Sequence, residues 1–214
     1  MVKGYIEAFH TTNKQSSKLI LNTNFIPSKK DANHWLGGGV YFYTDLYFAI
    51  QWGFIGVKKA DIEDFQEFKK ICDILTAKID FNNYKVLDIT VPDGYEIFLS
   101  FLEIIKKFYN NTEYEIIKNR GDAYIIKVLE KIEEKYNILT ISEYDILFAE
   151  YQNNIYKRTR RNKSDFYVGA EKQICVKNLN AISDINILNI DSMNANRIFD
   201  IVKKNRGDLN DKWS

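Results

Sequence analysis

Hydrophobic residues recur with two different spacings along the 214-residue chain. Alternating apolar and polar residues, together with short aromatic runs, predict strands at residues 4–9, 40–43, 74–81, 84–90, 144–151, 165–178 and 181–190. Apolar residues three and four apart predict helices at residues 13–22, 45–52, 60–71 and 194–204. A longer helical stretch, Tyr95 to Tyr136, separates two strand-rich regions. Because no repeat or low-complexity linker interrupts the pattern, we expect one α+β domain over residues 1–214, with a helical insertion at about 95–136.

Three consecutive glycines, Gly37 to Gly39, mark the most distinctive segment. They precede the aromatic run Val40-Tyr41-Phe42-Tyr43, which we interpret as a short strand. Thr44 is the predicted N-cap of the following helix, with Asp45 in its first turn. Such a glycine elbow can direct one ring into a cleft. A tight hairpin with an aromatic core strand is the other interpretation of the same pattern.

Composition and charge narrow the class of protein. Hydrophobic residues make up 45% and charged residues 28%, and the net charge of +1 gives no global attraction to nucleic acid or membrane. Cys72 and Cys175 both lie in apolar surroundings, so we expect buried, reduced thiols, as in a cytoplasmic protein. The N-terminus lacks the apolar region of a signal peptide, and no apolar run approaches the length of a membrane span. Two histidines and two scattered cysteines argue against a metal site.

Several short motifs occur in a fixed order along the first fifty residues. They are His10-Thr-Thr, a helix, Asn24-Phe25-Ile-Pro-Ser28, Trp35-Leu-Gly-Gly-Gly-Val-Tyr41-Phe and Ala49-Ile-Gln-Trp52. This order resembles the N-terminal half of the ADP-ribosyltransferase catalytic fold, in the branch related to poly(ADP-ribose) polymerases and bacterial toxin-like mono-ADP-ribosyltransferases. Near the other end, Gln173-Ile-Cys-Val-Lys-Asn178 is similar to the strand that carries the family's third functional residue. The resemblance implies an ADP-ribosyltransferase-like split antiparallel β-sandwich, with two antiparallel sheets around a cleft.

The resemblance also implies an NAD⁺ site without a metal. It implies that the Thr11 backbone holds the nicotinamide amide, that His10 bonds the adenine-side ribose, and that Tyr41 stacks on nicotinamide. Trp52 or Tyr47 would supply a second ring. The cofactor-binding set is therefore His10, Thr11, Thr12, Gly39, Tyr41, Tyr47 and Trp52, and the catalytic set is His10, Tyr41, Glu171 and Gln173. A flat cationic ring favours aromatic faces and a dry slot, in agreement with these residue types.

Two positions depart from the family pattern. Thr11 replaces a glycine, which main-chain contacts tolerate. Gln173 replaces the usual glutamate, so it can hydrogen-bond a ribose hydroxyl but supplies no charge. Glu171 lies two residues earlier and therefore on the same strand face. Either Glu171 supplies the charge, or the nucleophile needs little activation, or the protein binds NAD⁺ without turnover; we favour the first two together, and single transfer over polymer formation.

One run of positive charge precedes this strand. It consists of Lys157, Arg158, Arg160, Arg161 and Lys163. It is either a solvated loop or, by its position in the family frame, a substrate-binding segment that neutralises phosphates. The latter interpretation favours a nucleic-acid acceptor, RNA or DNA, slightly over a protein acceptor.

The leading hypothesis is a cytoplasmic NAD-dependent mono-ADP-ribosyltransferase of the kind that bacteria use as toxins or in phage defence. An intracellular toxin of this kind would need a neutralising antitoxin as partner. NAD⁺ hydrolysis, with water as the acceptor, is a second hypothesis. A non-catalytic NAD- or nucleic-acid-binding module is a third. RNA 2′-phosphotransfer ranks last, because it needs arginines that the sequence does not place near His10.

Overall fold

The computed structural model describes residues 4–29, 34–56, 62–151, 170–189, 194 and 196–203. Its strands are β1 (Tyr5–Asn13), β2 (Val40–Tyr43), β3 (Cys72–Asp80), β4 (Val86–Asp88), β5 (Ile146–Tyr151), β6 (Glu171–Val176) and β7 (Ile182–Ile187). Its helices are α1 (Lys14–Asn22), α2 (Leu46–Gly56), α3 (Phe65–Ile71), α4 (Pro92–Phe108), α5 (Asn111–Lys118) and α6 (Asp122–Tyr136), and residues 196–203 are also helical. The two short 3₁₀ helices are η1 (Ile141–Glu143) and η2 (Leu179–Ala181). The predicted α+β class is confirmed.

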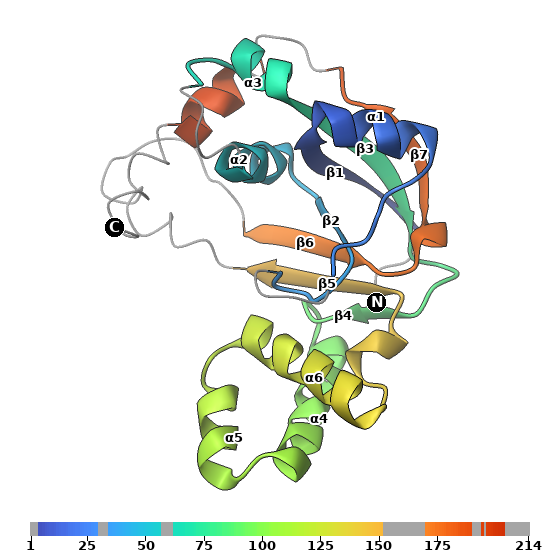
Figure 1. Cartoon of the computed structure of the whole chain (residues 1–214), viewed down its shortest axis with the longest axis vertical. Coiled ribbons are helices and arrows are strands. Elements are labelled where there is room, and N and C mark those ends of the chain that lie inside the picture. Colours follow the sequence, from blue (N-terminus) through green and yellow to red (C-terminus); the bar gives the residue numbers. More distant parts are fainter. Residues whose placement is uncertain are drawn as a thin grey trace.

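The seven strands form one hydrogen-bonded sheet in the order β4-β5-β6-β2-β1-β3-β7 (Figure 1). Strands β4 and β5 run parallel, and every other neighbouring pair is antiparallel. The expectation of two antiparallel sheets is therefore wrong, because the strands form one sheet in which one neighbouring pair is parallel. The sheet is nevertheless nearly divided, because β1 and β2 pair at one position only, Phe9 with Tyr43. One half consists of β4, β5, β6 and β2, and the other of β1, β3 and β7.

The two halves share a hydrophobic core. Phe42, Ile174 and Val176 from one half lie in the same buried cluster as Leu75 and Ile79 from the other. Alternation explains this contact, because every second residue of a strand faces the same side of its sheet. The halves thus pack on each other while one residue pair joins their main chains.

Helix boundaries follow local capping. Asn13 caps α1, since its side chain accepts from Ser16 N. Asp64 caps α3 by accepting from Glu67 N. At α2 the predicted cap is wrong by one residue: Asp45, rather than Thr44, immediately precedes the helix and accepts from Tyr47 N at 2.7 Å. Both residue types are good N-caps, so the sequence alone could not choose between neighbours.

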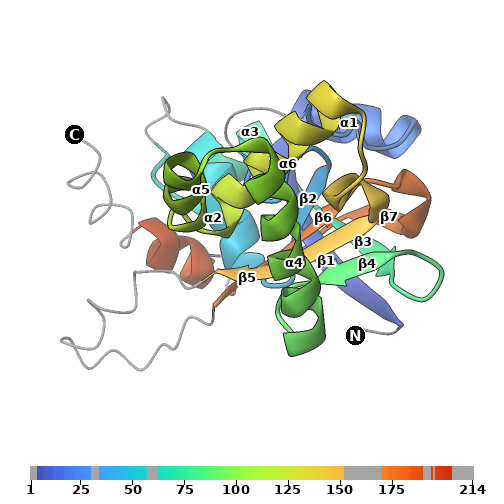
Figure 2. The ribbon, with the colours of Figure 1, turned by 90° about the horizontal axis from the view of Figure 1, so that it is seen from below.

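The stretch predicted as a helical insertion consists of α4, α5 and α6, which lie together beside β4 and β5 (Figures 1 and 2). Figure 1 shows them at the opposite end of the molecule from α1 and α3. Helix α5 begins with a capping box formed by Asn110 and Glu113. The inner faces of these helices bury Phe98, Leu129 and Ile132. Leu36 and Cys175, from outside the insertion, belong to the same cluster. In the part of the chain that the structure describes, no helix has the length and apolar character that crossing a bilayer requires.

Candidate ligand-binding cavity

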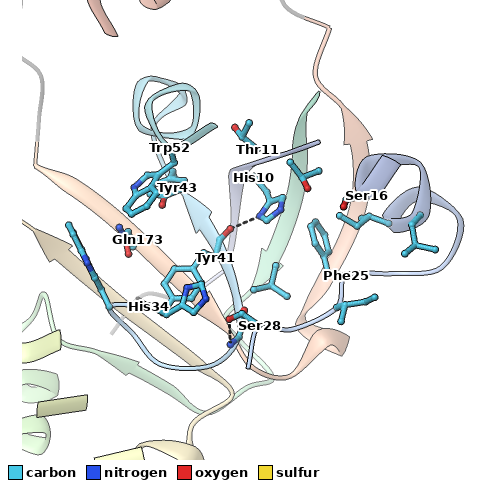
Figure 3. Close-up of a pocket in the computed structure, with 17 residues that line it drawn as sticks. His10, Thr11, Ser16, Phe25, Ser28, His34, Tyr41, Tyr43, Trp52 and Gln173 are labelled. Carbon is cyan, nitrogen blue, oxygen red and sulfur yellow. Dashed lines mark hydrogen bonds between the residues drawn. The ribbon is translucent and has the colours of Figure 1, made fainter. Parts of the chain in front are cut away.

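A cavity of about 450 Å³ opens where β1 and β2 separate (Figure 3). Beyond the single pair Phe9–Tyr43, a continued antiparallel ladder would pair Thr11 with Tyr41 and Thr12 with Val40. These residues line the cavity instead. Since an antiparallel strand directs alternate main-chain groups to each side, the separation leaves polar backbone groups facing the opening. The volume lies within the range of small-molecule sites.

His10 bridges the separation between the strands. Its Nδ1 lies 2.8 Å from the carbonyl oxygen of Tyr41. A carbonyl can only accept, so Nδ1 carries the hydrogen. Burial lowers the pKa of His10, and the bond to Tyr41 opposes that shift only in part. The imidazole is therefore neutral near pH 7, and Nε2 is a hydrogen-bond acceptor.

Tyr41 fixes the residues that precede it. Its hydroxyl accepts from Leu36 N at 2.8 Å and donates to Gly37 O at 2.7 Å. Its ring stacks on His34, with centroids 5.1 Å apart. Burial raises the pKa of Tyr41 far above its ordinary value, so the phenol stays protonated. Tyr41 thus forms part of the cavity wall with its hydroxyl already occupied.

Glu171 and Gln173 lie on the same face of β6, as the alternation of side chains along a strand predicts. In the β2–β6 ladder Tyr43 pairs with Gln173. The Glu171 Oε1 atom accepts from Trp52 Nε1 at 2.8 Å and from Gln173 Nε2 at 2.5 Å. Gln173 is 1% exposed, and its Oε1 has no hydrogen-bond partner in the described part of the chain. Its side chain is among those that line the cavity, so an unpaired buried acceptor lies at the cavity wall.

Aromatic rings enclose the end of the cavity near Gln173. Tyr43 stacks on Trp52 with a centroid distance of 6.1 Å. Trp35 meets Trp52 edge to face at 6.0 Å and Tyr151 at 4.6 Å. Burial raises the pKa of Glu171, and the hydrogen bonds from Trp52 and Gln173 lower it in part. This end of the cavity therefore combines aromatic surface with a buried carboxyl group behind it, whose pKa is raised.

The other end of the cavity is more apolar. It is bounded by helix α1 and the segment after it, through Leu19, Ile20, Phe25 and Ile26. The His10 ring lies edge to face against Phe25, with centroids 5.1 Å apart. Figure 3 shows the side chains arranged from Trp52 and Gln173, past Tyr41 and His10, to Phe25 and Ser16. An elongated ligand with an aromatic group at each end matches this arrangement.

Seven of the fourteen predicted site residues line this cavity. The lining includes His10, Thr11, Thr12, Gly39, Tyr41, Trp52 and Gln173. Glu171 is not a lining residue, and it contacts the cavity through Gln173. The prediction that Tyr47 lines the site is corrected by the structure. Tyr47 is absent from the cavity wall, is 7% exposed and packs in the core beside Phe48. The predicted substrate-binding run at residues 157–163 lies outside the described residues.

Sequence analysis assigned no role to four rings of the site. Phe25, His34, Trp35 and Tyr43 all line the cavity. Tyr43 could have been identified, since it lies two residues from Tyr41 on the same strand and so on the same face. His34 and Trp35 precede the glycines in a segment without regular structure, where periodicity gives no direction.

Two further expectations concern the cysteines and metals. Cys72 and Cys175 are free and buried, as predicted. Burial raises the pKa of the Cys175 thiol to about 12, which makes it a poor nucleophile. Among the residues that the structure describes, no group of three histidine, cysteine or acidic side chains could hold a metal ion.

Comparison with known proteins gives one distant relative. The chain is 24% identical over 192 residues to an uncharacterized protein of Methanocaldococcus jannaschii, a match that covers 83% of this chain and 84% of that protein. No protein-family model matches the chain. No solved structure matches it.

Proposed function

We propose that the protein binds NAD⁺ in this cavity and transfers a single ADP-ribose to a macromolecular acceptor. The observation that carries the proposal is the Gln173 oxygen, a buried acceptor without a partner among the described residues, set among aromatic rings in the cavity that His10 and Tyr41 also line. The sequence resemblance to ADP-ribosyltransferases agrees with this combination.

The two ends of the cavity suit the two ends of a dinucleotide. Nicotinamide in NAD⁺ is flat and cationic, so it favours the Trp35, Trp52 and Tyr43 rings and the nearby Glu171 carboxyl. An adenine ring would suit the apolar end near Phe25 and Leu19. His10 Nε2, an acceptor, and the Gln173 oxygen would receive ribose hydroxyls.

The chemistry requires a stabilised, electron-poor sugar carbon. NAD⁺ supplies a ribose carbon joined to a nicotinamide leaving group. Transfer breaks that carbon–nitrogen bond, whose electron pair leaves with neutral nicotinamide, and the acceptor bonds the carbon and releases a proton. Protein oxygens near such an oxocarbenium-like centre stabilise it. Gln173 would supply the nearest oxygen, while Glu171 holds the amide in place and adds negative charge from behind.

The acceptor is proposed from the sequence. The five cations of the run at residues 157–163 precede β6 closely in the chain. Because Lys and Arg bind phosphates without regard to base sequence, this run favours RNA or DNA over protein. A neutralising protein partner remains part of the proposal, since uncontrolled transfer to a cell's own nucleic acid would be toxic.

The test is incubation of the full chain with NAD⁺ labelled in the adenylate phosphate, together with separate protein, RNA and DNA pools. Released nicotinamide and label transferred to each pool are measured. Wild type should release nicotinamide and label one pool, preferably nucleic acid. His10→Ala and Tyr41→Ala should abolish both signals, while Tyr95→Ala, which removes an exposed tyrosine from α4, should retain them.

Other outcomes separate the alternatives. Nicotinamide release without labelled macromolecule would identify an NAD⁺ hydrolase. NAD⁺ binding without release, in wild type as in Glu171→Ala, would indicate a non-catalytic module. If calorimetry detects no NAD⁺ binding, the proposal is wrong.

A further inference from the structure

The segment Leu36–Gly39, here called the glycine loop, leads into Tyr41, and its last residue, Gly39, lines the cavity. Several of its main-chain polar groups form hydrogen bonds. Tyr41 Oη accepts from Leu36 N and donates to Gly37 O. Ser28 N and Oγ donate to Gly39 O at 2.9 and 2.8 Å. Between these anchors lies the amide of Gly38, whose partner comes from a distant part of the chain.

That partner is Glu130 in helix α6 of the insertion. Gly38 N donates to Glu130 Oε1 at 2.8 Å across 92 residues of sequence. Gly37 has a φ of 80° and lies so close to Glu130 that a Cβ there would collide with the carboxyl oxygen. The loop and the helix therefore fit each other through a glycine on one side and a carboxyl group on the other.

Packing alone does not account for a carboxyl group at this position. Glu130 is 5% exposed, and its neighbours Ile126 and Leu129 belong to the apolar core of the insertion. A buried polar group costs free energy unless it is hydrogen-bonded, and an apolar residue of similar size serves packing as well or better. The carboxyl is thus explained by the hydrogen bond that it accepts from the loop.

We propose that Glu130 is a positioning residue, through which the helical insertion sets the glycine loop and hence the Tyr41 wall of the cavity. The insertion is then a structural part of the site rather than a lid over it. Its effect on NAD⁺ rests on the proposed function, whereas its effect on the loop does not.

The test uses two substitutions at position 130 and one matched control. Glu130→Leu keeps apolar volume in the core and removes the acceptor. Glu130→Gln retains an oxygen that can accept from Gly38 N. Glu134→Leu makes the same change on the exposed face of α6. For each full-length protein, amide exchange at Gly38 is measured by NMR, and Kd for NAD⁺ is measured by calorimetry.

Glu130→Leu should accelerate exchange at Gly38 and raise Kd for NAD⁺ about tenfold, the effect of losing one positioning hydrogen bond. Glu130→Gln should restore both to within about threefold of wild type. Glu134→Leu should change neither. Unaltered exchange and affinity in Glu130→Leu would overturn the proposal, and so would a Gln variant as impaired as the Leu variant.

The two proposals fail separately. If wild type does not bind NAD⁺, the proposed function is wrong, and exchange at Gly38 alone decides the role of Glu130. Should Glu130→Leu not fold, Gly37→Ala displaces the carboxyl from the loop side, and normal Gly38 exchange in that variant would equally contradict the role.

Discussion

The imidazole of His10 takes the place of a main-chain ladder between β1 and β2: its Nδ1 is 2.8 Å from the Tyr41 carbonyl, one residue beyond the last strand pair. One side chain therefore connects the two halves of the sheet and also lines the cavity. Under the proposed function the same residue supports the fold and contacts the ligand, which makes its protonation state important for both.

Stability should fall in mild acid because of His10. Burial lowers the pKa of His10 below 6.5, so in the pH range below 6.5 and above the folded pKa the unfolded chain binds the extra proton. The free energy of unfolding should therefore decrease as pH falls through this range, with a slope of at most about 1.4 kcal/mol per pH unit. Urea unfolding between pH 7.5 and 5 measures it.

His10→Asn should remove this component of the slope. His34→Asn, which replaces the second of the chain's two histidines, should preserve it. An unchanged slope in His10→Asn would show that other groups cause the acid sensitivity.

Gln173→Glu should make stability depend on pH in the opposite direction. The new carboxyl would lie where Gln173 Nε2 now contacts Glu171 Oε1, and two adjacent buried carboxyls cannot both ionise readily. A raised folded pKa gives stability that is present at low pH and lost as pH rises. We expect near-wild-type stability at pH 5 and a loss of ~1–3 kcal/mol at pH 8 by urea unfolding.

Glu171→Gln in the Gln173→Glu background is the control for this prediction, since it restores one carboxyl and one amide. A double variant as pH-sensitive as the single one would mean that the two side chains do not interact. Under the proposed function, the same single variant should release nicotinamide faster at pH 8, because a carboxylate would then face the sugar.

Gly39→Ala should destabilise the protein. A Cβ at this position would lie 2.5 Å from Cys175 Sγ and 3.0 Å from Val176 O, both in a buried strand. Relief requires movement of packed groups, for which we expect ~1–3 kcal/mol by denaturant unfolding. At Gly56 an added Cβ meets nothing within 4 Å, so Gly56→Ala should change stability by less than about 1 kcal/mol. Equal effects at the two glycines would contradict the close approach of β2 to β6.

Tryptophan fluorescence should report ligand binding. Trp35 and Trp52 line the cavity, and the third tryptophan of the chain is Trp213. If nicotinamide contacts the aromatic end, titration with NAD⁺ should quench emission. Trp35→Phe and Trp52→Phe should each reduce the quenching, whereas Trp213→Phe should retain it. Quenching that disappears only in Trp213→Phe would place the ligand elsewhere.

Local patterns predicted much of the fold. The bounds of β2, the position of α1 and the helical stretch from α4 to α6 follow from periodicity and capping residues. The shared face of Glu171 and Gln173 follows from strand alternation and is confirmed by their hydrogen bond. These features depend on neighbours in the chain, so the sequence contains them directly.

The rest depends on contacts between distant segments. No local signal indicates that β1 and β2 pair at one position and then separate, since strand divergence is set by packing across the whole sheet. The contact of Gly38 with Glu130 joins residues 92 apart in the chain. The resemblance offers Trp52 or Tyr47 as a second ring, and of these two only Trp52 lines the cavity, because the packing of α2 decides which of its side chains face it.

The near-division of the sheet has a mechanical consequence. Only one strand pair and the His10 bond link the main chains of β1 and β2, so a change in the angle between the halves disturbs few hydrogen bonds. The halves are therefore held to each other mainly by side-chain packing, such as that of Phe42 and Ile174 with Leu75 and Ile79, whereas strand hydrogen bonds hold each half together internally.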